Sequence, residues 1–174
     1  MARRRTELEA PVMASIFEHL LGDHQRIRQT LVQLRAVVPG GDPQEHLHRL
    51  LRQYTAHARA EEQVFYSYMI HAKGLQQRAL RGIEDHLRLE SLLREIERIP
   101  RDDPRWNTIL VSLCEAIEQH LRDEERSLFS LARSALSDRE AAELGARFVV
   151  ERARLRRDVG ALGGPAARAA AAGR

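Results

Sequence analysis

Four short breaks divide the 174-residue chain into long segments that contain few helix-breaking residues. The breaks lie at residues 37–43, 73–74, 99–104 and 134–137, and each of the first three contains Pro, Gly or Asp. Leu, Ala, Arg and Glu, which favour helices, dominate the segments between them. The sequence therefore predicts helices at residues 13–37, 44–72, 75–98, 105–133 and 138–158.

The predicted fold class is all-α, because no run alternates apolar and polar residues as a half-buried strand does. The first four predicted helices are long and their connections are short, which is typical of an up-down-up-down four-helix bundle. A fifth, C-terminal helix follows, and Ser137 with Glu140 three residues later predicts a capping box at its start. A length of 174 residues suits one domain with a sizeable core.

This pattern suggests four parts along the chain. Residues 1–12 form an N-terminal extension, residues 13–133 the bundle, and residues 134–159 the region of the C-terminal helix. Residues 160–174 are a Gly/Ala/Arg-rich, low-complexity tail that we expect to be disordered.

Composition argues against several partners. The 28 basic residues are interleaved with 25 acidic ones and only 5% of residues are aromatic, so we expect a solvated surface and no nucleic-acid partner. No segment is apolar enough to predict a membrane span. A single cysteine, Cys114, excludes an intramolecular disulfide and suits a reducing compartment. We expect a cytoplasmic monomer or homodimer.

Each of the first four predicted helices carries an apolar stripe at steps of three and four residues, which marks its core-facing side. The second and fourth stripes continue to Tyr68 and Leu131. Polar residues interrupt the stripes, although unpaired carboxylates are costly to bury. They are His24, His57, Glu61, His86, Glu90, His120 and Glu124.

The chain contains an internal duplication. Residues 22–31 resemble residues 84–93, and residues 57–67 resemble residues 120–130. The shift is 62 residues from His24 to His86 and 63 residues from His57 to His120. Each half reads His, then His-x-x-x-Glu, and residues four apart lie on one helix face about 6 Å from each other.

Distances from the connecting turns place these residues at one level. His24 and His57 are equidistant from position 40.5, and His86 and His120 are equidistant from position 103. Glu61 and His86 are likewise equidistant from position 73.5. Four imidazoles and two carboxylates in one buried layer require cations, and this donor set suits iron, manganese or zinc. The number of donors exceeds the needs of one ion, which suggests two ions with both glutamates between them.

The order His, His-x-x-x-Glu, His, His-x-x-x-Glu resembles the hemerythrin-like, or HHE cation-binding, domain family over roughly residues 13–133. The resemblance implies two iron ions, a di-iron centre that an oxo or hydroxo group can also bridge. It implies this division of ligands: His24 and His57 on one iron, His86 and His120 on the other, and Glu61 and Glu124 bridging them.

Oxygen-carrying hemerythrins have a further histidine one turn after the third-helix ligand, where this chain has Glu90. Glu90 is either a seventh ligand or the ion-pair partner of Arg94, four residues on. As a ligand, its anionic oxygen would favour ferric iron, and hence redox chemistry over reversible O₂ carriage.

Several neighbours of these residues are assigned structural roles. Asp23 and Asp85 adjoin histidines but point about 100° away, so we expect them on the helix surface. Glu62 and Glu125 are expected to face water or arginines, and Tyr54 is expected to pack in the core.

The sequence therefore predicts a non-haem di-iron protein that binds or reduces O₂, H₂O₂ or NO. Redox handling (peroxide or NO detoxification) or sensing is the leading interpretation. The alternatives are a non-catalytic O₂-binding or iron-sensing and storage module, and a di-iron oxygenase. Whether the protein is an enzyme is left open.

Overall fold

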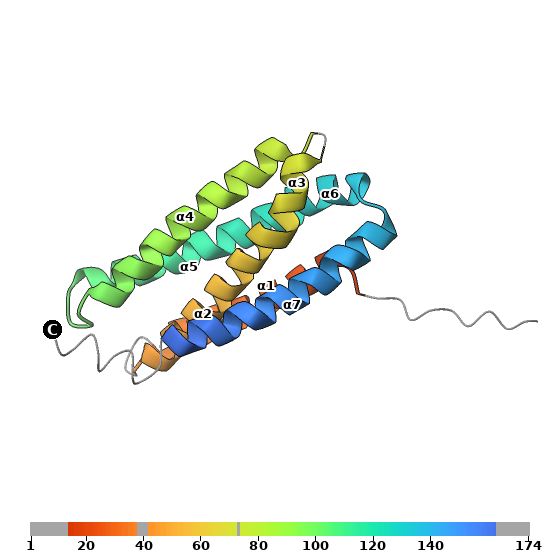
Figure 1. The fold of residues 1–174 in the computed structure, drawn as a ribbon. Coiled ribbons are helices and arrows are strands. Elements are labelled where there is room, and N and C mark those ends of the chain that lie inside the picture. The colour runs from red at the N-terminus through yellow and green to blue at the C-terminus, as the bar shows by residue number, and fades with distance from the viewer. Residues whose placement is uncertain (1–13, 38–41, 73, 163–174) are drawn as a thin grey trace, which may run out of the picture.

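The computed structural model describes residues 14–37, 42–72 and 74–162, and every regular element within them is helical (Figure 1). The predicted all-α fold is thus confirmed for these residues, whereas the N-terminal extension and tail residues 163–174 lie outside them. The elements are α1 (Ile16–Val37), α2 (Gln44–Glu61), η1 (Glu62–Tyr66), α3 (Ser67–His71), α4 (Gln76–Arg98), α5 (Arg105–Asp123), η2 (Glu124–Leu128), α6 (Phe129–Ala135) and α7 (Asp138–Leu162).

Short polar sequences begin and end the helices close to the predicted positions. The Oδ1 of Asp42 accepts a hydrogen bond from the backbone N–H of Gln44 at 3.0 Å. The predicted capping box at α7 is present: Glu140 Oε2 accepts from the backbone N–H of Ser137 at 2.9 Å, and Ser137 Oγ accepts from the backbone N–H of Glu140 at 3.3 Å. Gly74, at φ 86°, turns the chain between α3 and α4 in a conformation that favours glycine. Helix α7 continues to Leu162, beyond the predicted end at residue 158.

Two π-helical turns, η1 and η2, interrupt the long second and fourth helical runs at equivalent positions of the duplication. A π turn holds more residues than an α turn, so it rotates the following residues relative to the core. Tyr68 is therefore only partly buried and Leu131 is 40% exposed, contrary to the prediction that both face the core. Met69 and Ala132 are fully buried instead.

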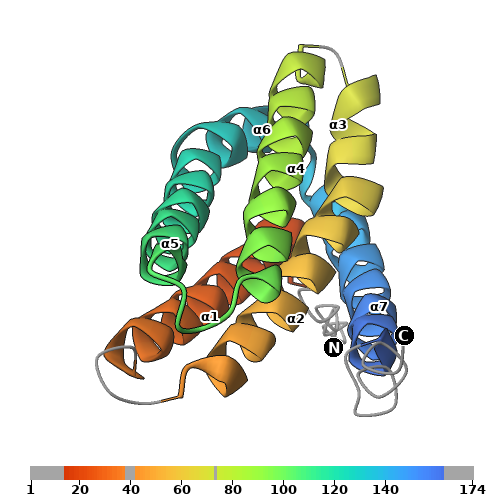
Figure 2. The ribbon, with the colours of Figure 1, turned by 90° about the vertical axis from the view of Figure 1, so that its left-hand side faces the viewer.

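The helices pack as a bundle in which α7 belongs to one side. Helix α4 lies along α5, and α1 lies along α2 (Figure 2). Helix α7 packs against both α1 and α2, so it covers the outer side of the first half of the duplication (Figures 1 and 2). Among the described residues, no helix combines the length and the apolar character needed to cross a membrane.

The hydrophobic core consists of two clusters separated along the bundle. On α1, for example, Leu20 belongs to one cluster and Ile27 to the other. His24 lies between them and is fully buried. On α4, Ala79 and Leu89 flank the bundle's middle in the same way. A buried polar layer therefore crosses the bundle where the two clusters meet.

Gly145 lets α7 approach the start of α1 at backbone distance. A Cβ atom built at Gly145 would lie 2.7 Å from the carbonyl oxygen of Ala14 and 2.9 Å from the backbone nitrogen of Ile16. Backbone atoms cannot move aside as a flexible side chain can, so any larger residue would push α7 away from the segment that leads into α1.

We expect Gly145→Ala to lower the free energy of unfolding by about 1–3 kcal/mol, because the added methyl group overpacks this contact. Gly22→Ala is the matched control, since its Cβ would meet only the flexible guanidinium of Arg26 at 3.7 Å. The control should be neutral or stabilising by about 0.5–1 kcal/mol, as expected for Gly→Ala in a helix. Urea denaturation of both variants measures the difference, and equal stabilities would contradict the proposed docking.

Candidate metal centre

The structure brings six of the seven predicted site residues together in the polar layer. Their donor atoms form two groups, each within 4.8 Å, and they are at most 4% exposed. Glu124 belongs to both groups. One group is Glu61, His86, His120 and Glu124, and the other is His24, His57 and Glu124.

Each carboxylate lies between two histidines from different helices. Glu61 Oε2 is 3.6 Å from the Nε2 atoms of both His57 and His86. Glu124 Oε2 is 3.4 Å from Nε2 of His24 and 3.7 Å from Nε2 of His120. The Nε2 atoms of His86 and His120 are 3.0 Å apart. All these donors therefore converge on a small volume at the centre of the layer.

Carboxylates behind the histidines set their orientation. The Nδ1–H of His24 donates to Glu125 at 2.8 Å, and the Nδ1–H of His86 donates to Glu62 at 2.9 Å. A carboxylate that accepts from Nδ1 keeps the proton there and turns the Nε2 lone pair towards the centre. The expectation that Glu62 and Glu125 face water or arginines is thus incomplete, because each also holds a histidine. Their positions directly after Glu61 and Glu124 are the only sequence signal for this role.

Several converging atoms have no hydrogen-bond partner within the described residues, although all are buried. They are His24 Nε2, His57 Nε2, both carboxylate oxygens of Glu61, and Glu124 Oε2. Lone pairs and carboxylate oxygens repel one another, and unpaired buried acceptors cost about 1–3 kcal/mol each. Cations at the centre would satisfy all of these atoms at once, so this donor set fits the metal ions that the sequence predicts.

The charged groups of the layer have shifted acidities. Burial, and then repulsion by Glu124, raises the pKa of Glu61 well above its ordinary value. Burial would raise the pKa of Glu124 as well, but the surrounding imidazoles, His120 above all, lower it overall. Burial lowers the pKa of His57, and lowers that of His120 to about 4. The imidazoles of His57 and His120 are therefore neutral at pH 7, as metal ligation requires.

Glu90 lies outside both groups of converging atoms. Its Oε1 is 2.7 Å from Arg59, and its Oε2 is 3.2 Å from Arg94. The ion pair with Arg94 is the second of the two readings considered from the sequence. Arg59, on α2, is a partner that the sequence did not suggest.

Asp23 is buried at 2% exposure, so the expectation of a surface position is wrong for this residue. Its Oδ2 lies 3.6 Å from Nδ1 of His57, and its Oδ1 lies 2.6 Å from Arg152 on α7. Burial would raise its pKa, but His57 and Arg152 lower it overall. Asp85, its counterpart, is partly exposed and pairs with Arg88 at 3.2 Å, as expected. The difference arises because α7 covers the first half only.

Tyr66 is a neighbour of the site that sequence reasoning missed. Its hydroxyl donates a hydrogen bond to Glu124 Oε1, and its ring stacks on His86 with centroids 5.3 Å apart. Phe129, the duplicated position, stacks on His24 at 5.7 Å with the same 23° inclination. Comparing Tyr66 with Phe129 in the duplication would have singled out the added hydroxyl. Tyr54 is fully buried, as expected, and its ring meets those of His86 and His120 edge-on at 6.2 and 6.5 Å.

One cavity reaches the polar layer from outside. It has a volume of about 270 Å³ and is lined by Tyr66, Arg78, Arg81, Gly82, Asp85, His120, Asp123, Glu124, Ser127 and Leu128. His120 and Glu124, two of the converging residues, thus line a cavity that is large enough for water-sized molecules.

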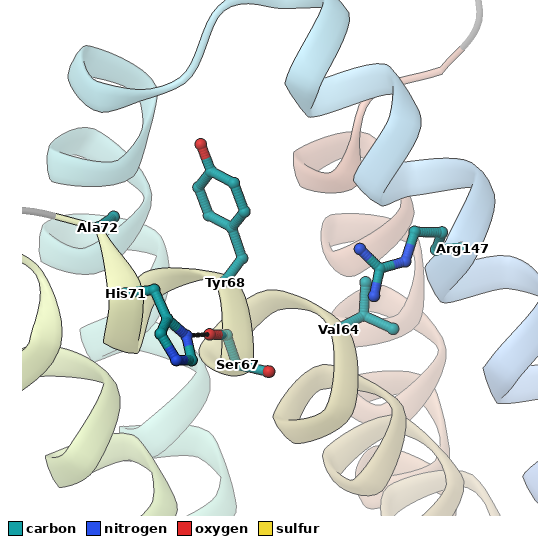
Figure 3. A pocket seen from close by; sticks show the side chains of 6 residues that line it. All are labelled: Val64, Ser67, Tyr68, His71, Ala72 and Arg147. Carbon is teal, nitrogen blue, oxygen red and sulfur yellow. Dashed lines mark hydrogen bonds between the residues drawn. The ribbon is translucent and has the colours of Figure 1, made fainter.

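A second hollow, of about 320 Å³, lies between α3 and α7 and contains none of the converging donors (Figure 3). Arg147 reaches from α7 towards Val64 there, and Nδ1 of His71 lies 2.8 Å from the carbonyl oxygen of Ser67. His71 is therefore occupied by its own helix, and we assign this hollow no role at the metal centre.

We expect Glu61→Gln to stabilise the metal-free protein at pH 7 by about 1–3 kcal/mol, because the amide need not be protonated to be buried. A raised pKa means that the folded state holds the proton above pH 4.5, where the unfolded state releases it. The free energy of unfolding of the wild type should therefore fall as the pH rises from 4.5, and the gain in the variant should vanish near that pH. Urea denaturation at pH 5 and pH 7 in chelator tests this.

The exposed Glu115 provides the control, and Glu115→Gln should leave the free energy of unfolding unchanged at both pH values. A Glu61→Gln variant less stable than the wild type at pH 7 would show that Glu61 is ionised and stabilised in the metal-free protein.

Comparison with known proteins agrees with this geometry. A DNA nickase from Nostoc sp. is 25% identical over 140 residues, which cover 79% of this chain and 39% of the nickase. The chain thus spans well under half the length of this curated relative. No solved structure matches significantly. The model of the hemerythrin HHE cation-binding domain matches residues 15–132, which include all six converging donors, and the chain belongs to this family.

Proposed function

We propose that this chain is a non-haem di-iron protein that binds or reduces a small diatomic or peroxide ligand. The observation that carries the proposal is the convergence of six buried donor residues on one central volume, where several donor atoms have no hydrogen-bond partner in the described parts of the chain. Membership of a cation-binding family supports metal ligation, and four imidazoles with two carboxylates suit iron. Four helical runs in an up-down-up-down arrangement would hold this site.

The distances support a division of the donors between two ions. His24 and His57 would hold one iron, and His86 and His120 the other. Glu61 and Glu124 each lie within 3.7 Å of a histidine from either pair, which suits two bridging carboxylates. Glu90 stays outside the ligand set, because both of its oxygens are held by arginines.

Bound iron would supply electrons and an open coordination position. Two features of the surrounding protein favour redox handling over reversible O₂ carriage. Burial and the charge of Glu124 raise the pKa of Tyr66 well above its ordinary value, so its hydroxyl holds a proton beside Glu124. The polar cavity at His120 and Glu124 would admit water and protons, and in iron proteins the polarity of the ligand pocket helps to decide between O₂ binding and O₂ activation. Glu90 adds nothing to this preference, because both of its oxygens are held by arginines.

The name of the Nostoc relative concerns DNA, but the matching part is only 39% of that protein. We infer that the shared part is the metal-binding bundle. The proposal includes no nucleic-acid partner for this chain, because its basic residues pair widely with acidic neighbours along the helices.

We expect the wild-type protein, loaded anaerobically with Fe²⁺, to hold two irons per chain. His57→Ala/His120→Ala should retain fewer than one, because each ion loses an imidazole. Glu90→Ala is the matched control and should retain two. Inductively coupled plasma mass spectrometry together with a protein assay measures the number of irons per chain in each variant. Two irons in the double variant would overturn the site assignment, and loss of iron from Glu90→Ala would make Glu90 a ligand.

Mixing the di-ferrous protein with O₂ should give rapid oxidation to the di-ferric form, and when an electron donor such as ascorbate is supplied, added peroxide should then be reduced to water. Tyr66→Phe should retain both irons and lower peroxide turnover about tenfold or more, because a proton donor is lost. Phe129 shows that a phenylalanine fits the duplicated position. Stopped-flow spectra measure both steps, and a stable, reversible oxy species in the wild type would favour the non-catalytic O₂-binding alternative.

A further inference from the structure

The duplication gives the metal centre two equivalent outer faces. A residue of the first half and its counterpart 62 or 63 positions later occupy matching places, as His57 and His120 do. The cavity beside His120 includes Arg78, Gly82 and Ser127. The matching face of the first half should therefore open beside His57 if the two halves were covered alike.

Helix α7 covers the first of these faces. Ile16, Leu20 and Val64, the counterparts of Arg78, Gly82 and Ser127, are buried in a hydrophobic cluster. Leu144 and Phe148 of α7 belong to that cluster, and the ring of Phe148 meets that of His57 at 6.1 Å. Arg152 adds an ion pair with the buried Asp23.

The face of the second half has no such cover within the described residues. Arg78 and Arg81 are exposed there, and Asp85 and Ser127 are partly exposed. The burial of the donors reflects this difference. His120 and Glu124 are 3% and 4% exposed, whereas His57 and Glu61 are both 0% exposed. Among the described residues, one histidine and one glutamate of the centre, His120 and Glu124, thus line this cavity.

The lining of the cavity combines two arginines, Arg78 and Arg81, with the carboxylates of Asp85, Asp123 and Glu124. Asp85 pairs with Arg88 at 3.2 Å, and Asp123 accepts a hydrogen bond from Gln119 at 2.8 Å. In the described parts of the chain, no ion pair engages Arg78 or Arg81, so their guanidinium groups are available to a ligand. At roughly 30 Å³ for each water molecule, the cavity volume of about 270 Å³ corresponds to about nine water molecules, which is ample room for an anion of a few atoms.

We propose that exogenous ligands reach the metal centre through this cavity and bind on its His86/His120 side, where Arg78 and Arg81 attract small monovalent anions. This inference rests on the proposed di-iron function and assigns the accessible coordination position to one of its two ions. Helix α7 makes the two chemically similar ions unequal, because it closes the His24/His57 side.

Azide binding to the di-ferric protein tests the route, with the azide-dependent absorption band as the readout. Ser127→Trp places a large ring in the cavity and should slow azide association about tenfold or more. Ser130→Trp is the matched control, because Ser130 is exposed on the following turn and does not line the cavity. The control should bind azide at the wild-type rate.

Arg78→Ala/Arg81→Ala tests the attraction of anions without filling the cavity. At low salt the variant should bind azide about tenfold more weakly than the wild type, and at about 0.5 M salt the two should converge because charge is screened. Arg126→Ala removes an exposed arginine outside the cavity and should leave azide binding unchanged.

The iron content of every variant separates this inference from the proposed function. A wild type without two irons overturns the proposed function, whereas unaltered azide kinetics in an iron-replete Ser127→Trp variant overturns the route alone. If Ser127→Trp fails to fold or to hold iron, the arginine variant decides. Wild-type azide affinity at low salt would then overturn the proposal.

Discussion

The structure depends on bringing six electron-rich side chains together where water cannot solvate them. Their histidine nitrogens and carboxylate oxygens form two groups, each within 4.8 Å, and several of these atoms have no hydrogen-bond partner among the described residues. Such an arrangement is costly without cations, so the two apolar clusters on either side must hold it in place. Binding of metal ions would turn this unfavourable layer into a favourable one, which links the stability of the bundle to its function.

The π-helical turns show how local structure serves this layer. Each begins at or directly after a ligand glutamate, and π turns occur frequently at functional sites. Glu61 points to the centre, while Glu62 accepts a hydrogen bond from His86. In the second half, Glu124 points to the centre, while Glu125 accepts a hydrogen bond from His24. Two successive glutamates thereby serve as a central donor and as an outer support for a histidine of another helix.

Helix α7 removes the symmetry that the duplication would otherwise impose. It provides Phe148 against His57 and Arg152 against Asp23, so the first half of the site is enclosed by residues outside the matched family domain. The second half keeps a polar opening beside His120 and Glu124. Two ions with nearly the same protein donors would thus differ in access, and an asymmetric centre can bind an exogenous ligand at one defined position.

The sequence by itself determined the helices and the six converging residues, because apolar periodicity and distance from a turn depend on residues close together along the chain. Tertiary structure decided what lies behind and around those residues. The ion pair between Glu90 and Arg59, the burial of Asp23 under α7 and the hydrogen bond from Tyr66 to Glu124 all join different helices. Their partners are chosen by packing in three dimensions, and the π turns shift the phase that a regular helix would predict. Which side of the centre is open follows from the place where α7 docks, which no local pattern encodes.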